Sequence, residues 1–229
     1  MKAFLEEQWH HLPEAEVIGF LETSPDKGLD CLEVERRQGQ FGPNKITQKK
    51  GRGLMVLFLL QFHQPLVYIL LAAAVVTSFL QEWVDAGVIY GVVLVNAIIG
   101  FIQEAKAVKA IEALSQAITS TATVLRGGER RQIPAAELIP GDIVLLQSGD
   151  KVPADLRILS SRELQIDEST LTGESVPVQK QSGVLAQDTL LADRLNMAYS
   201  STLVTYGIAS GTVVATGNST EVGRINELI

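Results

Sequence analysis

The stretch LMVLFLLQFHQPLVYILLAAAVVTSFL, residues 54–80, contains no Asp, Glu, Lys or Arg. A second charge-free stretch, AGVIYGVVLVNAIIGFI, follows at residues 86–102. A membrane-spanning helix needs about 20 mostly apolar residues, because each residue adds about 1.5 Å across a hydrocarbon core of about 30 Å. The first stretch is long enough, and the second is near the lower limit with Gln103 at the interface. We therefore expect two transmembrane helices, at residues 54–80 and 86–105.

The alternative is a pair of helices buried in a soluble protein. We disfavour it because a chain of 229 residues is too small to enclose both helices on all sides. Residues 81–85 allow only a tight hairpin between the spans and carry Glu82 and Asp85. The positive charges that flank the pair are Lys49, Lys50, Arg52, Lys106 and Lys109. Positive residues stay on the cytoplasmic side of a bilayer, so we expect a multi-pass protein of the cell membrane with both termini cytoplasmic.

Composition excludes other classes. Lys and Arg total 19 against 26 Asp and Glu, a net charge of −7, so we expect no nucleic-acid partner, because phosphate binding needs clustered basic residues. The single cysteine excludes an internal disulfide and a multi-cysteine metal site. His10 and His11 are adjacent, and neighbouring side chains on a helix point about 100° apart, so we expect no metal site there.

The remaining chain divides around the two spans. Residues 1–53 are polar, and Pro13, Pro25 and Gly42-Pro43-Asn44 predict a cytoplasmic segment of short helices. Residues 106–229 begin with apolar residues at helical spacing, which predict a stalk helix. Short apolar runs between Gly and Asp turns follow, and they predict a small antiparallel sandwich or barrel. The fold class expected is therefore an α+β membrane protein with a helical hairpin and a cytoplasmic β domain.

The expected β domain contains several short strands and a final helix. The strands expected are residues 123–125, 131–133, 143–146, 156–159, 164–166, 200–205 and 211–215. The last residues, 221–229, have a helical pattern, with Asn218 as the expected N-cap and Glu221 as its capping-box partner. Asp142, Asp150 and Asp155 have Gly or Pro neighbours, which favours roles in turns and caps over acid catalysis.

One polar loop, DESTLTGESVP at residues 167–177, follows an expected strand. Gly173 permits a tight backbone and Pro177 restricts it, which would hold Glu174 at the tip of the loop. A carboxylate presented in this way could orient a water molecule and accept its proton. Taken alone, a Glu in such a loop is more often simply solvated, and the loop needs the context of the whole chain.

That context is a series of motifs that resembles the P-type cation-transporting ATPases. The soluble motifs are Gly28-Leu29, Glu33-Val34, Arg37, Gly42-Pro43-Asn44, Pro140 to Val144 (PGDIV), Gly149 to Asp155 (GDKVPAD), Thr172 to Ser175 (TGES), and Thr216-Gly217 with Thr220, Gly223 and Ile225. Pro65 to Ala74 and Asn96 to Gly100 look like the first two membrane helices of the type II, calcium-pump-like branch. The resemblance covers nearly the whole chain, and several ordered motifs are far more specific than a lone TGES.

The resemblance implies a mechanism. Family members hydrolyse ATP through an aspartyl-phosphate intermediate, and their actuator domain, a distorted jelly roll, serves the second step. Glu174 would position a water molecule against the phosphate and act as the base. Thr172 and Gly173 would shape the loop and donate hydrogen bonds to phosphate or water, and Ser175 would support Glu174. Movement of the actuator domain would couple hydrolysis to the first two membrane helices.

The chain departs from the family in what it lacks. The family's phosphorylated Asp lies in a DKTGT motif, which these 229 residues do not contain. We therefore expect this segment to bind no cofactor and no metal, with ATP and Mg²⁺ serving the complete pump. The expected partners are the lipid bilayer, the remainder of the pump and a transported cation. Calcium is the leading cation by branch resemblance, and sodium, potassium, protons and manganese stay open.

The origin of the chain also stays open. It would be a truncated chain, the product of a split or degraded gene, or one polypeptide of a larger assembly. By itself we expect it neither to be phosphorylated nor to transport ions. The alternative function is a non-catalytic, membrane-anchored interaction or regulatory module derived from such a pump.

Overall fold

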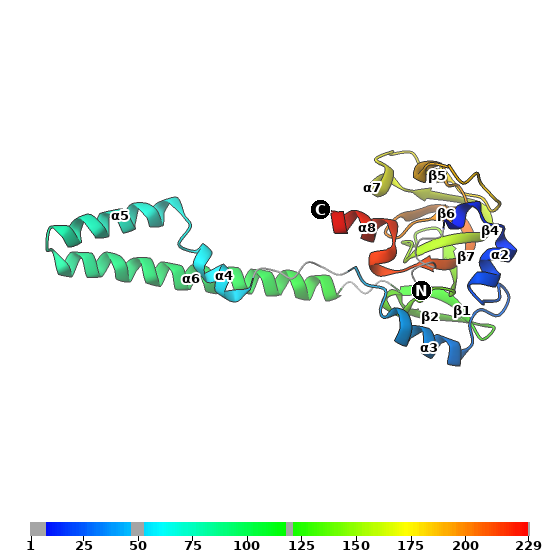
Figure 1. Ribbon diagram of the computed structural model, residues 1–229, viewed down its shortest axis with the longest axis horizontal. Helices are drawn as coiled ribbons and strands as arrows, with labels where there is room; N and C mark the ends of the chain where they lie inside the picture. The colour runs from blue at the N-terminus through cyan, green and yellow to red at the C-terminus, as the bar shows by residue number, and fades with distance from the viewer. Residues whose placement is uncertain (1–7, 47–52, 118–120, 229) are drawn as a thin grey trace. The chain divides into compact units, whose positions relative to one another are not determined.

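The computed structural model describes residues 8–46, 53–117 and 121–228. The chain forms two compact units (Figure 1). The helical unit comprises residues 48–118, and the sheet unit comprises residues 1–47 and 119–229. The helical unit is therefore inserted, in sequence, within the sheet unit.

The helical unit contains α4 (Leu54–Leu60), α5 (Pro65–Phe79) and α6 (Trp83–Ala117). The first span expected at residues 54–80 is thus interrupted, since four residues separate α4 from α5. The cause is Pro65, which is the first residue of α5 and lacks the N–H that a continuing helix would use. The residue before a proline avoids helical angles, and Gln64 has the extended values φ −126° and ψ 140°.

The break carries polar side chains that contact α6. Gln61 is buried, and its amide donates a 2.6 Å hydrogen bond to the carboxylate of Glu104. Gly100 makes room for it, because a Cβ at that position would overlap the Gln61 amide oxygen. The Phe58 ring also meets Phe101 edge to face, with centroids 5.9 Å apart. These contacts hold α4 against α6, at the C-terminal end of the span expected at residues 86–105.

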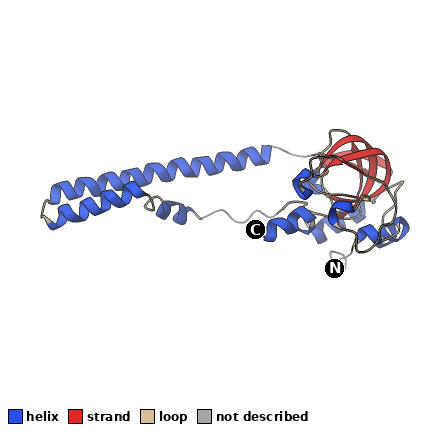
Figure 2. Cartoon of the chain, turned by 90° about the horizontal axis from the view of Figure 1, so that it is seen from above, coloured by secondary structure: helices blue, strands red, loops and turns tan. Residues whose placement is uncertain are grey.

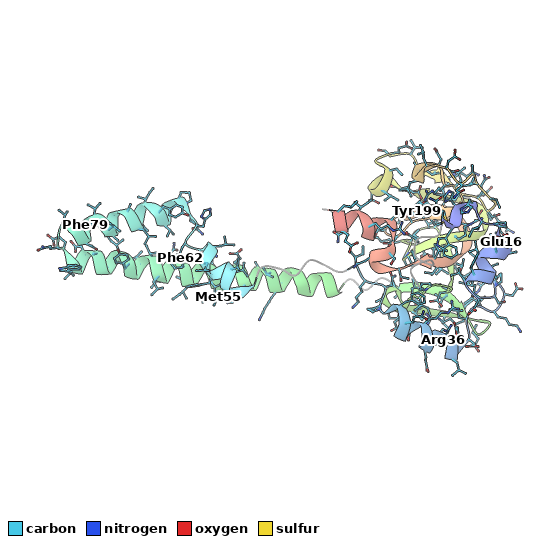
Figure 3. The ribbon with its side chains drawn as sticks, viewed as in Figure 1. Glu16, Arg36, Met55, Phe62, Phe79 and Tyr199 are labelled. Carbon is cyan, nitrogen blue, oxygen red and sulfur yellow. The ribbon has the colours of Figure 1, made fainter. Side chains whose placement is uncertain are left out.

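Helices α5 and α6 pack side by side through small and β-branched residues (Figures 1 and 2). The buried residues of this pair are Val67 and Ala74 on α5 and Ala86, Val93 and Ala97 on α6. Most other apolar side chains of the unit face outward, and Phe79 is 84% exposed (Figure 3). Among the described residues, one helix, Trp83–Ala110, is long and apolar enough to cross a membrane, whereas α5 is apolar but has 15 residues.

The sheet unit contains one antiparallel sheet, whose strands curve around a core (Figure 2). The strands are β1 (Thr121–Arg126), β2 (Glu129–Pro134), β3 (Ile143–Gln147), β4 (Asp155–Asp167), β5 (Val178–Gln179), β6 (Met197–Ala198) and β7 (Leu203–Ala215). Their order is β2-β1-β3-β7-β4-β5, and β6 pairs with β4. The prediction of an antiparallel β domain with accompanying helices is confirmed.

Two pairs of expected strands are single long strands. Residues 156–159 and 164–166 belong to β4, and residues 200–205 and 211–215 contribute to β7. The polar residues between them stay in the sheet because β4 and β7 pair along their length with several register shifts. At one shift Gly207 has φ +82°, and a Cβ there would overlap the carbonyl oxygens of Arg162 and Glu163. Only glycine fits this position without displacing the partner strand.

Short helices complete the sheet unit. They are η1 (Trp9–His11), α2 (Glu14–Phe20), α3 (Cys31–Phe41), η2 (Ala135–Glu137), α7 (Ser169–Thr172), η3 (Leu191–Asp193), η4 (Gly217–Ser219) and α8 (Glu221–Leu228). The N-cap expected at Asn218 is wrong. The cap of α8 is Thr220, whose hydroxyl accepts a 3.0 Å hydrogen bond from the Gly223 N–H, because residues 217–219 already form η4.

The N-terminal helices pack on the sheet. One cluster joins Trp9, Val17 and Leu21 to Met197, Tyr199 and Val214, and another joins Leu29 and Val34 to Ile139. Leu29 also forms a parallel bridge with Arg126 of β1. The buried guanidinium of Arg37 donates to the carbonyl oxygens of Leu21 and Pro140. Residues that precede the helical unit in sequence therefore cover part of the sheet and add a bridge to β1.

Candidate functional site

The loop that carries the TGES motif is built by the end of β4 and a single turn of helix. The Asp167 carboxylate accepts a 2.9 Å hydrogen bond from the Ser169 N–H, which starts α7. Gly173 ends it in the left-handed conformation, with φ 79°, and donates its N–H to the Ser169 carbonyl over 3.0 Å. The chain then returns through Pro177 into β5, which pairs with Gln165 and Ile166 of β4.

Glu174 follows directly after this left-handed glycine, and its side chain is exposed to solvent. Its backbone N–H donates a 3.3 Å hydrogen bond to the Thr172 hydroxyl oxygen. Val176, two residues on, is 75% exposed although it is apolar. The carboxylate therefore lies on a projecting tip, next to an apolar side chain that another surface could cover.

Thr172 and Ser175 differ in their hydrogen bonds within the loop. The Thr172 hydroxyl donates its only proton to the Glu168 carbonyl over 3.1 Å, so in this conformation it shapes the loop and has no proton left for a ligand. The N–H of Gly173 is likewise used inside the turn. Ser175 is exposed, and within the described part of the chain no hydrogen bond joins it to Glu174.

Sequence reasoning missed a buried ion pair beneath the loop. Lys180 Nζ lies 2.7 Å from Glu168 Oε1, and both side chains are 0% exposed. Burial raises the pKa of Glu168 and lowers the pKa of Lys180, and the opposite charge of each partner counteracts the shift of the other. The two residues flank the TGES loop in sequence, and that spacing is the only signal that could have found them.

The three aspartates outside this loop serve turns and caps, as expected. Asp142 accepts from the Ile139 N–H and pairs with the Arg126 guanidinium, and Asp150 accepts from the Gln147 N–H. Asp155 is nearly fully buried and accepts 2.8 Å hydrogen bonds from the Ser200 and Glu221 N–H groups. It therefore connects the start of β4 to the start of α8.

Asn44 brings the separate motifs of the sheet unit together. Its amide N–H₂ donates to the carbonyl oxygens of Ala135 and Pro153, over 2.9 and 2.8 Å. Its amide oxygen accepts from the Gly217 N–H over 2.8 Å. One side chain from the GPN motif thus contacts the GDKVPAD motif and the TG of the C-terminal motif, which explains physically why these short elements occur together.

Asp155 predicts a pH dependence of stability. Burial raises the pKa of Asp155 to about 7, whereas an unfolded Asp has a pKa of about 3.9. Between these values the folded chain holds a proton that the unfolded chain releases, so stability falls as the pH rises through this window. We expect the free energy of unfolding, measured with urea in detergent micelles, to fall more steeply from pH 5 to pH 8 for the parent than for Asp155→Asn. Parallel curves would contradict this assignment.

The described residues include no group of three or more His, Cys, Asp or Glu side chains placed to hold a metal ion. The TGES loop likewise has a single carboxylate at its tip, which does not fit Mg²⁺ or the phosphates of ATP as a resident site. We therefore assign neither group to the residues that the structure describes. The chemistry available at the tip is that of one exposed, positioned carboxylate.

Comparisons with known proteins place the chain in a family. Residues 116–229 match the family model of the P-type ATPase actuator domain, and residues 9–77 match that of the cation transporter/ATPase N-terminus. The cation-transporting ATPase pma1 of Synechocystis is 54% identical over 218 residues, which are 95% of this chain and 24% of that protein.

Two further relatives extend the comparison. The probable cation-transporting ATPase F of Mycobacterium bovis is 49% identical over 96% of this chain and 24% of its own length. The calcium-transporting ATPase of Bacillus subtilis is 41% identical over 97% of this chain and 25% of its own length. The chain thus spans about a quarter of the length of the curated relatives that it matches. It belongs to the P-type cation-transporting ATPases, of which it carries the N-terminal segment and the actuator domain.

Proposed function

We propose that this chain acts as the N-terminal part of an ATP-driven cation pump, and that Glu174 is the base that hydrolyses the aspartyl-phosphate intermediate. The observation that supports this most directly is the exposed Glu174 carboxylate, held behind a left-handed glycine by hydrogen bonds within the loop. A projecting carboxylate cannot enclose a substrate, but it can reach a phosphate that another domain presents.

The proposed chemistry needs one proton transfer at this carboxylate. Glu174 orients a water molecule in line with the acyl phosphate and accepts a proton as the water oxygen attacks phosphorus. The bond between phosphorus and the aspartate oxygen breaks, which releases inorganic phosphate and restores the aspartate carboxylate. Thr172 holds the backbone N–H of Glu174, and Gly173 sets the direction of the chain, so the base is positioned before the phosphate arrives.

The same proposal includes the membrane arrangement. Helix α6 crosses the bilayer, and α5 with α4 forms the first, broken span, so that both ends of the helical unit are cytoplasmic and the protein lies in the cell membrane. The outward-facing apolar side chains of α5 and α6 support contact with lipid. The curved sheet is then the distorted jelly roll of the actuator domain, with Ca²⁺ as the leading candidate for the transported cation, as in the name of the Bacillus relative.

A chimaera tests this function. These 229 residues replace the matching segment of the Synechocystis ATPase, and ATP-driven cation uptake is measured in inside-out vesicles. We expect a phosphoenzyme to form and cation uptake to follow. If the chimaera inserts into the membrane but neither forms a phosphoenzyme nor transports, while the separate chain alters the activity of the intact relative, the chain is a regulatory module instead.

A further inference from the structure

The Glu168–Lys180 ion pair closes the base of the TGES loop. Glu168 is the residue before α7, and Lys180 is the residue after β5, so the pair joins the two ends of the segment that carries Glu174. The backbone is joined at the same level, since the Lys180 N–H donates to the Leu164 carbonyl over 2.8 Å. The loop is therefore fastened at both of its ends to β4.

The same pair leads by a continuous series of contacts to the proposed base. The Glu168 carbonyl accepts hydrogen bonds from the N–H groups of Leu171 and Thr172, over 2.8 and 2.9 Å. It also accepts a hydrogen bond from the Thr172 hydroxyl. The oxygen of that hydroxyl in turn accepts a hydrogen bond from the backbone N–H of Glu174. Three donors thus converge on one carbonyl, so a shift of the Glu168 backbone would move Thr172 and with it the backbone of Glu174.

The pair is costly to bury and has few other partners. Lys180 Nζ also reaches the Arg194 carbonyl at 3.4 Å and lies 5.7 Å from the centre of the Tyr199 ring. Glu168 Oε2 is buried and has no hydrogen-bond partner among the described residues. A buried ion pair is weak evidence for stability, because hydrophobic replacements are often as stable. Its specific geometry here argues for a role in fixing the loop.

We propose that Glu168 and Lys180 are positioning residues that set the pose of Glu174 for dephosphorylation. The inference rests on the proposed function, since it assigns these residues to the hydrolytic step. Neither side chain touches the reacting atoms, because both are buried and Glu174 is exposed. Loss of the pair should therefore impair one step of the cycle and leave phosphorylation, which the loop does not serve, unchanged.

The test uses Lys180→Met in the chimaera, with phosphoenzyme formation and decay measured separately. We expect decay to slow by about tenfold, because small displacements of a catalytic group cost one to two orders of magnitude in rate. Formation of the phosphoenzyme should stay at the parent rate. Lys180→Arg keeps the positive charge and should restore decay to nearly the parent rate, which a loss of packing alone would not predict.

The matched control is another buried ion pair among the described residues of the sheet unit. Arg126 pairs with Asp142 through two hydrogen bonds of 2.8 and 2.7 Å, and neither residue belongs to the TGES loop. Asp142→Asn should lower stability without changing the ratio of decay to formation. If Lys180→Met and Asp142→Asn change that ratio equally, the Glu168–Lys180 pair serves only stability and the proposal is wrong.

A second measurement uses the 229-residue chain itself, in detergent micelles. Hydrogen exchange at the Thr172 and Glu174 amides should be faster in Lys180→Met, and amides of β1 should be unchanged. Unchanged exchange at both loop amides would also overturn the proposal. Failure of the proposed function gives a different result: decay would then be insensitive to Glu174 itself, whatever the state of Glu168 and Lys180.

Discussion

Replacing Glu174 with Gln in the chimaera is expected to slow phosphoenzyme decay by roughly 10²- to 10⁴-fold, the range that a positioned general base contributes. Gln has nearly the same shape as Glu and can still hold a water molecule by a hydrogen bond, but it cannot accept a proton. The side chain is exposed, so the change should leave the free energy of unfolding within about 0.5 kcal/mol of the parent. Phosphoenzyme should therefore form normally and accumulate.

The measurement is a chase of radiolabelled phosphoenzyme with unlabelled ATP. Glu137→Gln is the matched control, because Glu137 is also an exposed glutamate of the sheet unit and lies in η2 rather than in the loop. It should decay at the parent rate. Equal decay of the parent and Glu174→Gln would show that the water molecule loses its proton to another group, and the role assigned to Glu174 would be withdrawn.

The largest effect on stability is expected for Arg157→Met. Arg157 is 0% exposed and lies in β4. Its guanidinium donates to five backbone carbonyls, those of Trp9, Leu12, Ile158, Gly183 and Asn196. Methionine fills similar space but donates no hydrogen bond. The Gly183 and Asn196 carbonyls keep the Asn196 side-chain amide and the Ile158 N–H as donors, whereas those of Trp9, Leu12 and Ile158 lose the guanidinium. We expect a loss of about 3–5 kcal/mol, because each unsatisfied buried polar group costs about 1–3 kcal/mol and some relaxation recovers part of it.

Urea unfolding of the chain in detergent micelles, followed by tryptophan fluorescence, measures this loss. Trp9 is a suitable probe because its carbonyl is one of the five acceptors and its side chain packs in the cluster with Tyr199. Arg162→Met is the control, since Arg162 is an exposed arginine of the same strand, and it should change stability by less than about 0.5 kcal/mol. Similar losses for both variants would mean that the carbonyls find other donors.

The elements that could be predicted from sequence are those that local patterns encode. A charge-free run with helical continuation identifies α6, and apolar runs between Gly and Asp turns identify the antiparallel strands. Pro65 is visible in the sequence as a possible end of a helix. The length of a span, however, is judged by counting uncharged residues, and that count takes no account of the backbone N–H that proline lacks. The joining of two runs into β4 depends on pairing with β7, which lies beyond β5 and β6 in the chain, and no local pattern reports such a partner.

The candidate site divides in the same way. Glu174 and Gly173 are conspicuous because a motif surrounds them and a tight turn requires glycine. Arg157 and the Glu168–Lys180 pair are not, because a charged residue in a strand normally predicts an exposed face. Arg157 is buried by partners up to 148 residues distant, and Lys180 by Tyr199 and the Arg194 carbonyl. Buried charged residues of this kind are identified only in the folded structure, where the groups that contact them can be seen.

The insertion of the helical unit within the sheet unit has a consequence for biogenesis. Leu29 forms its backbone bridge with Arg126 of β1. The side chain of Asn44 accepts its hydrogen bond from Gly217, which the ribosome adds 173 residues later. In the proposed membrane arrangement, the first helices are therefore synthesised before their sheet and remain without it while the two apolar stretches enter the bilayer. A nascent chain stalled shortly after α6 should display the Trp9 and Leu29 surfaces to chaperones, and release from them should follow only after β7 and α8 have been synthesised.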